Sequence, residues 1–255
     1  TLGASGYSQA AGTFTGGATT FAPNGPLVLS GGAFNANGAA VTSSGLITVS
    51  GGTYSAGGAT QTFNAGLTVS GGTYSGGAGT TDVNGDLTLS SGTLNGGSGP
   101  FTVSGNWSKS GGTFTPGGGA NTVTFDGAGT QTLNAGSASF NNLSHSGAGT
   151  LRVITSALTV AGTLDNSNGT FDANGLAVDV TGLATLNFGS YLAGGATQTF
   201  GGLTVNNGTF TGAVGVVDVN GTYTQTNGTF TAPSSTFSVS GNFARTAGTF
   251  ASNGG

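Results

Sequence analysis

The stretch that decides the fold runs from Leu67 to Gly85 and reads LTVS GGTYS GGAGT TDVNG. Apolar and polar residues alternate in LTVS and in TDVNG, and a single aromatic residue, Tyr74, stands between Thr73 and Ser75 in GGTYS. Alternation with a period of two is typical of β-strands, and Val, Thr and Tyr favour them. The segment therefore predicts three short strands separated by Gly-rich corners.

This arrangement recurs with a period near twenty residues. In each copy a Gly and a small residue precede one large apolar residue, which is Phe14, Phe34, Tyr54, Tyr74, Leu94 or Phe114, and later Tyr191, Phe210, Phe230 or Phe250. Strands of about three residues are too short for a stable hairpin sheet, so each must pair with the equivalent strands of neighbouring coils. The sequence predicts an all-β fold, a single parallel β-solenoid (β-helix) of about 13 coils with three short strands per coil. The large apolar residues point inwards and form the structural core.

The repeat is regular over residues 1–114 and 191–255 and irregular over about 115–190, all within one predicted domain, 1–255. Candidate inward residues in the irregular stretch stand at uneven spacings, and they are Leu133, Leu151, Leu164 and Phe171. Their uneven spacing leaves the phase of these coils unassigned.

The predicted corners carry a ladder of small polar residues. Asn24, Asn64 and Asn84 stand at multiples of twenty, with Ser44 and Ser104 between and after them, and each lies just before a Gly. Asn and Gly tolerate the left-handed backbone of a tight bend, and stacked amides can hydrogen-bond along an axis. We expect these Asn residues to be structural.

Composition excludes several classes of function. The 255 residues include 54 Gly, no Cys and no Met, and only 4% are charged. Three scattered cations, Lys109, Arg152 and Arg245, cannot neutralise a phosphate track, so no nucleic acid is expected as a partner. No apolar run approaches the length of a membrane helix, so no membrane insertion is expected either.

The sequence also predicts no enzyme, no cofactor and no metal. The acidic residues are all Asp and are scattered, and His145 is the only His, so neither a paired acid and base nor a His-rich zinc site is expected. Asp82 and Asp86 flank one corner, but a repeated calcium site needs an Asp in every coil, and most coils lack one.

Outward Thr residues flank the inward aromatic residue in many coils, as in Thr113 and Thr115. This Thr-rich face resembles the ice-binding face of antifreeze β-solenoids, although Asn95, Asp165 and Asp172 interrupt it. Thr also favours exposed strand positions for its own reasons. Ice binding is therefore an alternative function.

The two ends of the chain match in phase. TFSVSGNFARTAGTF at 236–250 aligns with TLGASGYSQAAGTF at 1–14, and neither end shows a polar cap. Uncapped coils expose strand edges and half of a core. We expect copies of the chain to stack head to tail through Thr1, Leu2, Tyr7, Phe237 and Phe243. The alternative is a window of a longer repetitive polypeptide, and the start at Thr1 favours a processed product or a fragment.

Two phrases, GGTFTPGGGANTVTFDGAGTQTL from Gly111 and FNNLSHSGAGTL from Phe140, resemble repeats of large secreted bacterial surface proteins. Those proteins are adhesin-like or filamentous-haemagglutinin-like β-solenoids. The resemblance implies an extracellular or cell-surface location and a role in adhesion, matrix or appendage formation. We therefore expect a structural subunit of an extracellular filament; the alternative is a segment of a larger adhesin that binds host or environmental surfaces or glycans.

Overall fold

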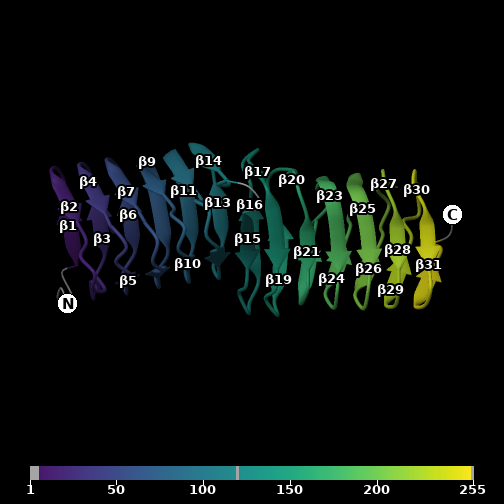
Figure 1. The fold of residues 1–255 in the computed structure, drawn as a ribbon. Helices are drawn as coiled ribbons and strands as arrows, with labels where there is room; N and C mark the ends of the chain where they lie inside the picture. The colour runs from purple at the N-terminus through teal and green to yellow at the C-terminus, as the bar shows by residue number, and fades with distance from the viewer. Residues whose placement is uncertain (1–5, 119–120, 254–255) are drawn as a thin grey trace. The chain divides into compact units, whose positions relative to one another are not determined.

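The computed structural model describes residues 6–118 and 121–253, and these form strands β1 to β32 with no helix among them. The predicted fold class is confirmed: the protein is an all-β parallel β-solenoid of about 12 turns with a period of about 20 residues. The chain divides into two compact units, residues 1–124 (unit 1) and 125–255 (unit 2). Figure 1 shows the flat, stacked coils within each unit.

In unit 1 each coil contributes three short strands to three parallel ladders. The first ladder comprises β1 (Tyr7–Gln9), β3 (Leu27–Leu29), β6 (Ile47–Val49), the starts of β9 (Leu67–Ser75) and β11 (Leu87–Asn95), and β13 (Trp107–Lys109). The second comprises β2 (Thr13–Thr15), β4 (Ala33–Asn35), β7 (Thr53–Ser55), the ends of β9 and β11, and β14 (Thr113–Thr115). The third comprises β5 (Val41–Ser43), β8 (Gln61–Phe63), β10 (Thr81–Val83) and β12 (Phe101–Val103).

Unit 2 repeats this arrangement. One ladder comprises β16 (Gln131–Asn134), β19 (Thr150–Val153), β22 (Thr170–Asp172), β24 (Ser190–Leu192), β26 (Thr209–Thr211), β29 (Thr229–Thr231) and β32 (Thr249–Ala251). A second comprises β17 (Ser139–Phe140), β20 (Leu158–Val160), the starts of β23 (Val178–Leu186) and β25 (Gln198–Val205), β27 (Val217–Val219) and β30 (Phe237–Val239). The third comprises β18 (Asn142–His145), β21 (Leu164–Asn166), the ends of β23 and β25, β28 (Tyr223–Gln225) and β31 (Phe243–Arg245). The remaining strand, β15 (Thr122–Phe125), runs across the boundary between the units.

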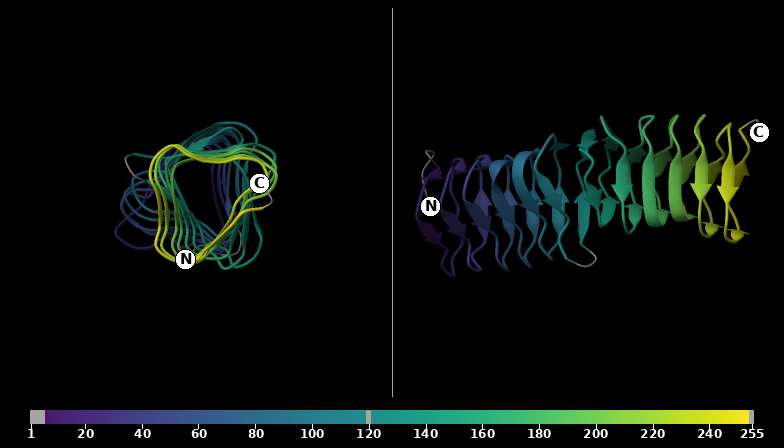
Figure 2. Two further views of the ribbon diagram at one scale, coloured as in Figure 1. Left: turned by 90° about the vertical axis from the view of Figure 1, so that its right-hand side faces the viewer. Right: turned by 90° about the horizontal axis from the view of Figure 1, so that it is seen from above.

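Viewed along the axis, the green to yellow coils of unit 2 superimpose into a rounded triangle (Figure 2). The three sides correspond to the three ladders, and the strands on each side alternate buried and partly exposed side chains. The interior is therefore filled by one or two side chains from each strand, as the period of two requires.

In several coils the Gly two residues before the inward residue is required by the stacking. Gly52 has a φ of +65°, which a residue with a Cβ rarely adopts, and an added Cβ would lie 2.2 Å from the carbonyl oxygen of Gly32 in the preceding coil. Gly32 and Gly228 have the same left-handed backbone and the same close approach, whereas Gly72 and Gly208 do not have a positive φ.

The period of twenty persists through the stretch where the sequence pattern is irregular. Gln131, Leu151, Phe171 and Tyr191 follow one another in register at steps of twenty. Leu133 pairs with Val153 in the same ladder, whereas Leu164 belongs to a different side of the coil, where it pairs with Leu143. The sequence pattern fades here because Gln replaces an aromatic residue at the inward position of one coil.

Candidate functional site

The residues predicted to form the core lie in register along one ladder of each unit. In unit 1 the rings of Phe14, Phe34, Tyr54 and Tyr74 stack at centroid separations of 4.7, 4.8 and 5.2 Å. Leu94 and Phe114 continue this ladder, and in unit 2 the same position holds Tyr191, Phe210, Phe230 and Phe250. Most of these side chains are fully buried, but Phe14 and Phe250 are only half-buried because they belong to terminal coils.

Buried Gln side chains accept hydrogen bonds from the Tyr hydroxyls of these aromatic stacks, a feature that was not predicted from the sequence. The Tyr54 hydroxyl donates to Gln61 Oε1 at 2.7 Å, and Gln61 Nε2 donates to the carbonyl oxygens of Ala39 and Ala59 in successive coils. Tyr191 and Gln198 repeat this arrangement, with a hydroxyl-to-Oε1 distance of 2.6 Å. The separation of seven residues between Tyr and Gln in both pairs was the signal available in the sequence.

The coil of β30, β31 and β32 has an open edge. Each of these strands pairs with the preceding coil, and within residues 6–118 and 121–253 no strand pairs with its other side. The Phe243 side chain is 52% exposed, and Phe237 and Phe250 are half-buried. Two of the residues predicted as assembly ends, Phe237 and Phe243, therefore lie on an unpaired face of the described structure.

The coil of β1 and β2 forms the matching edge at the other end of the sequence. The Tyr7 ring contacts Phe14 at 5.4 Å and Phe21 at 5.5 Å, and Tyr7 itself is half-buried. The Tyr7 hydroxyl donates to Gln9 Oε1 at 2.8 Å, and Gln9 Nε2 donates to the carbonyl oxygen of Gly12 at 2.9 Å. The other two predicted end residues, Thr1 and Leu2, lie outside the described residues.

The predicted corner ladder is formed in part. Asn84 Nδ2 donates to Asn64 Oδ1 at 3.1 Å, on the exposed surface. Among the described residues other than Gly, the left-handed backbone is found at Asn37, Ser137, Thr155 and Asn174, and not at Asn24, Asn64 or Asn84. These three positions therefore do not adopt the left-handed backbone, and near Asn64 the residue that adopts it is Gly66, with a φ of +107°.

A second amide ladder, outside the predicted corner positions, lies in unit 2. Asn227 Nδ2 donates to Asn207 Oδ1 at 2.9 Å, and both side chains are exposed. Each of these residues precedes a Gly, as Asn24 and Asn84 do.

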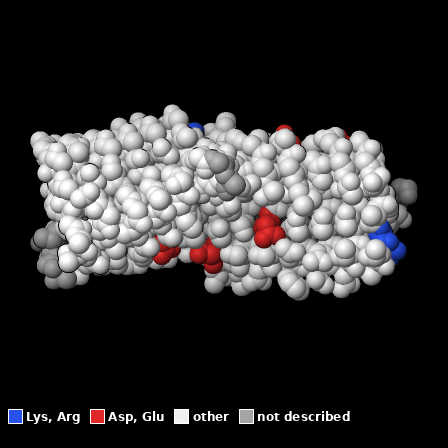
Figure 3. Space-filling view, in the orientation of Figure 1, with Lys and Arg blue, Asp and Glu red and all other residues white. Residues whose placement is uncertain are grey.

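The carboxylates of Asp82 and Asp86 accept hydrogen bonds from the next coil, near the surface. Asp86 Oδ1 accepts hydrogen bonds from the backbone and side-chain nitrogens of Asn106, and Asp82 Oδ1 accepts one from Thr102. Figure 3 shows that charged side chains on this face of the molecule are few and separated. In the part of the chain that the structure describes, no group of three or more His, Cys, Asp or Glu could hold a metal ion.

His145 lies in the interior of unit 2, not on the surface. Asn166 Nδ2 donates to the carbonyl oxygen of Ser190 at 2.7 Å, so Asn166 Oδ1 is the acceptor that faces His145 Nδ1 at 2.9 Å. His145 Nδ1 therefore carries the proton, and the buried Nε2 has no hydrogen-bond partner. Burial lowers the pKa of His145 below its usual value, and the hydrogen bond to Asn166 opposes this shift.

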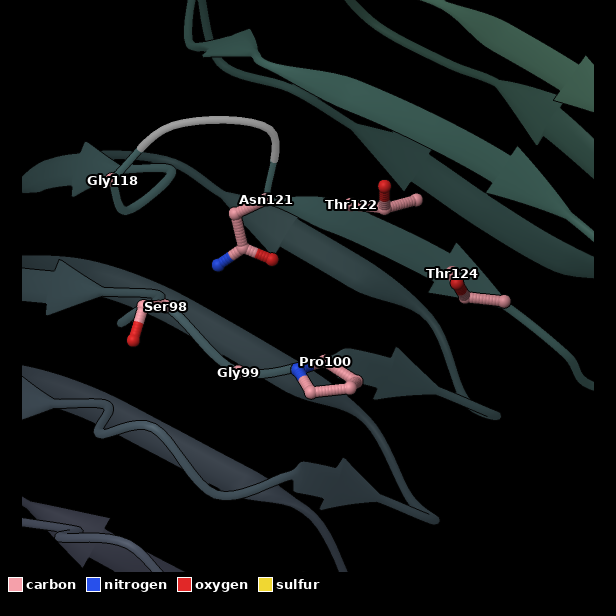
Figure 4. Close-up of a pocket in the computed structure, with 7 residues that line it drawn as sticks. All are labelled: Ser98, Gly99, Pro100, Gly118, Asn121, Thr122 and Thr124. Atoms are coloured by element: carbon pink, nitrogen blue, oxygen red, sulfur yellow. The ribbon is translucent and has the colours of Figure 1, made fainter.

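One shallow hollow of unit 1 carries no chemistry. It encloses about 370 Å³ and is lined by Ser98, Gly99, Pro100, Gly118, Asn121, Thr122 and Thr124 (Figure 4). The Asn121 amide donates to the carbonyl oxygens of Gly96 and Gly97, at 3.3 and 2.8 Å. None of these side chains is a nucleophile activated by a base or an ionisable group near neutral pH.

The outward Thr residues form in-register rows in unit 1. One row contains Thr53, Thr73, Thr93 and Thr113, and a neighbouring row contains Thr48, Thr68 and Thr88. In unit 2 the row before the inward residue continues as Thr150, Thr170, Ser190, Thr209, Thr229 and Thr249. The row after the inward residue is interrupted by an ion pair in which Arg152 Nε lies 2.8 Å from Asp172 Oδ2. Asp165, expected to interrupt the same row, lies on a different ladder opposite Ser144.

Comparisons with protein-family models, with curated proteins and with solved structures find no match to this chain. Among the described residues there is no helix that is long and apolar enough to cross a membrane.

Proposed function

We propose that this protein is a structural subunit that stacks end to end into an extracellular filament. The proposal is carried by one observation: the coil of β30, β31 and β32 presents an open strand edge and partly exposed aromatic rings. Coils of the same chain already pack on one another through such edges inside each unit. The occupant that fits the open edge is therefore another coil of this sequence, supplied by a second copy.

The coil of β1 and β2 matches the open edge in residue type and spacing. Tyr7 and Phe14 are separated by seven residues, as are Phe243 and Phe250. When the first coil of one copy follows the last coil of another, Tyr7 continues the stack of Tyr223 and Phe243, whose rings lie 4.9 Å apart. Phe14 likewise continues the stack of Phe230 and Phe250, whose rings lie 5.1 Å apart.

The end-to-end contact between two copies is expected to be of moderate strength. Full burial of a Phe side chain contributes about 1.5–3 kcal/mol, and the terminal rings are already partly buried. Association of two molecules costs roughly 4–15 kcal/mol of translational and rotational freedom before any contact counts. The backbone hydrogen bonds of three strands add to the aromatic contribution, so assembly is expected only above a threshold concentration.

An extracellular location is supported by the resemblance of the sequence to secreted bacterial surface proteins. Binding to host or environmental surfaces or glycans would belong to the alternative, in which these coils are a segment of a larger adhesin. No particular receptor is favoured, because the face drawn in Figure 3 carries few charged side chains.

Electron microscopy and sedimentation of the purified chain over a range of concentrations test the proposal. We expect rods that lengthen with concentration, and Phe243→Asp should abolish the lengthening. Phe188→Asp is the matched control, because Phe188 is 73% exposed but lies at a lateral corner of unit 2. Single rods at all concentrations, or equal loss of assembly in both variants, would contradict end-to-end stacking; single rods would favour the adhesin alternative.

A second candidate function, ice binding, is favoured by the parallel Thr rows of unit 1. A row such as Thr53, Thr73, Thr93 and Thr113 offers regularly spaced hydroxyl and methyl groups on one side of the coil. Thermal hysteresis of the purified chain measures this activity directly. It should fall in Thr73→Lys and persist in Thr62→Lys, since Thr62 faces outward from another ladder; a chain without hysteresis has no ice-binding function.

A further inference from the structure

The open coil of unit 2 carries a cation at a position that faces the interior in the coil before it. In β28 the side chains of Tyr223 and Gln225 are fully buried and face inwards. Tyr223 pairs with Phe243 and Gln225 pairs with Arg245 in the next strand, β31. Arg245 therefore occupies the register of an inward residue on the last described strand of this ladder.

On the exposed last described strand, Arg245 makes the same backbone contact that Gln225 makes one coil earlier. Arg245 Nη2 donates to the carbonyl oxygen of Gly248. Gln225 Nε2 makes the equivalent contact with the carbonyl oxygen of Gly228, at 3.3 Å. Burial raises the pKa of the Tyr223 hydroxyl, and the charge of Arg245 opposes the shift, as expected for a guanidinium close to that ring.

The same position in the coil of β1 holds a neutral amide. Residues 7–12 and 223–228 both read Tyr-x-Gln-x-x-Gly, whereas residues 243–248 read Phe-x-Arg-x-x-Gly. In both Tyr-containing coils the hydroxyl donates to the Gln Oε1, at 2.8 Å for Tyr7 and 3.1 Å for Tyr223. The coil that would stack on β31 thus brings Gln9, not a carboxylate, opposite Arg245.

Within residues 6–118 and 121–253 Arg245 forms no ion pair, so it has no carboxylate partner there. Asp218, on a neighbouring ladder, stands at an outward position of β27 and accepts a hydrogen bond from Ser238 Oγ at 2.6 Å. Covering the coil with the β1 coil of a second copy would therefore bring the guanidinium against amide and phenol groups. Burying an unpaired charge is unfavourable enough to offset the stabilisation by the aromatic rings. Inward-pointing charges on edge strands are a known means of discouraging edge-to-edge pairing.

We infer that Arg245 is a charge gate on the end-to-end interface: it weakens stacking of a second copy and favours a partner coil with a carboxylate at the position of Gln9. This inference rests on the proposed stacking, and it names the residue that limits it. One neutral side chain at position 245, or one complementary side chain opposite it, is then enough to change the affinity of the open coil for a second copy.

A charge-complementation cycle tests the gate. Sedimentation gives the concentration at which assembly begins for the unchanged chain, Arg245→Gln, Gln9→Glu and the double variant. We expect each single variant to lower this concentration by roughly tenfold or more, because one removes the buried charge and the other pairs it. The double variant should return toward the unchanged chain, because its Glu is then buried without a partner. Arg245→Lys keeps the charge and should behave as the unchanged chain.

The outcomes distinguish the proposed effect of Arg245 from the proposed end-to-end stacking. Assembly of the unchanged chain at the same concentration as Arg245→Gln would overturn the gate and leave end-to-end stacking intact. Assembly of Arg245→Gln alone would support the gate and show that the unchanged chain is held apart. Failure of every variant to assemble would overturn both proposals. Circular dichroism and urea unfolding of each variant identify any that fail to fold, and for those Arg245→Ala replaces Arg245→Gln and Gln9→Asp replaces Gln9→Glu.

Discussion

Two buried polar sets, one in each unit, differ in how fully their hydrogen bonds are made, although unit 2 also repeats the set of unit 1 at Tyr191 and Gln198. In unit 1, Tyr54 and Gln61 form a closed set in which the hydroxyl and the amide nitrogen each donate to an oxygen. In unit 2, His145 and Asn166 form a chain that ends at His145 Nε2, a buried nitrogen without a partner. A buried polar group is tolerated at little cost when it is satisfied, and costs about 1–3 kcal/mol when it is not. The coil around His145 is therefore expected to be a local weak point.

The largest expected effect comes from breaking the aromatic column of unit 1. Tyr74 is fully buried, its ring lies 5.2 Å from that of Tyr54, and its hydroxyl is 2.8 Å from Thr81 Oγ1. Tyr74→Ser should lower the free energy of unfolding by about 3–5 kcal/mol, the usual cost of removing a core aromatic residue. Tyr74→Phe, which loses only the hydroxyl contact, should cost about 1 kcal/mol. Urea unfolding followed by circular dichroism measures both, and equal stability of Tyr74→Ser and the unchanged chain would contradict the inward placement.

The next largest loss of stability is expected when the hydrogen-bonded set of Tyr54 and Gln61 is broken. Gln61→Leu leaves the Tyr54 hydroxyl and the carbonyl oxygens of Ala39 and Ala59 without this partner in the interior. We expect a loss of about 1–3 kcal/mol in the same unfolding measurement. In a Tyr54→Phe background the loss should be smaller, since one of the stranded groups is already gone. Additive losses in the double variant would argue against a shared hydrogen-bonded set.

The hydrogen-bonded pair of His145 and Asn166 predicts that the free energy of unfolding depends on pH. The pKa of His145 is lowered by burial, so the folded protein binds fewer protons than the unfolded chain as pH falls through the usual His range near 6.5. Stability from this group is therefore complete above that range and is lost progressively as pH falls through it toward the lowered pKa of the folded protein. His145→Gln removes the titration but can still donate to Asn166.

The measurement is the urea midpoint of both proteins at several pH values. The unchanged chain should lose more stability on acidification than His145→Gln. Asp165, whose pKa is raised by burial, contributes equally to both curves and cancels in the comparison. Parallel curves for the two proteins would show that His145 is not held in its neutral form by the fold.

The smallest expected effect is at the exposed corner ladder. Asn84→Ala removes the 3.1 Å hydrogen bond to Asn64, which lies in contact with water. Surface substitutions of this kind change stability by about 0.5 kcal/mol or less. Asn227→Ala removes the 2.9 Å contact with Asn207 and is its counterpart in unit 2. A loss of several kcal/mol in either variant would mean that the amide ladders, and not the interior, hold the coils together.

Much of the fold could be predicted because its determinants are local. The left-handed Gly52, the inward Tyr54 and the outward residues on either side of it are repeated at a fixed step, and the register follows from that step. The assignment of coil phase stopped where the inward position is Gln131, since a polar residue does not stand out among Thr, Ser and Gly, although Leu151 and Phe171 in the same ladder were candidates. The candidate interface was predicted only in outline: the residues Phe237 and Phe243 followed from phase, but the role of Arg245 did not.

The sequence by itself determined the coil: its period, its Gly corners and the alternation that places Phe, Tyr, Leu and Val inside, because each of these depends on residues close together in the chain. Only the tertiary structure decided which polar side chains complete the interior. Gln61 reaches carbonyl oxygens in two coils, His145 meets Asn166 one coil away, and Arg245 stands where Gln225 is buried. Contacts between coils depend on stacking in three dimensions, and the chain alone does not show which neighbours a buried polar atom will find.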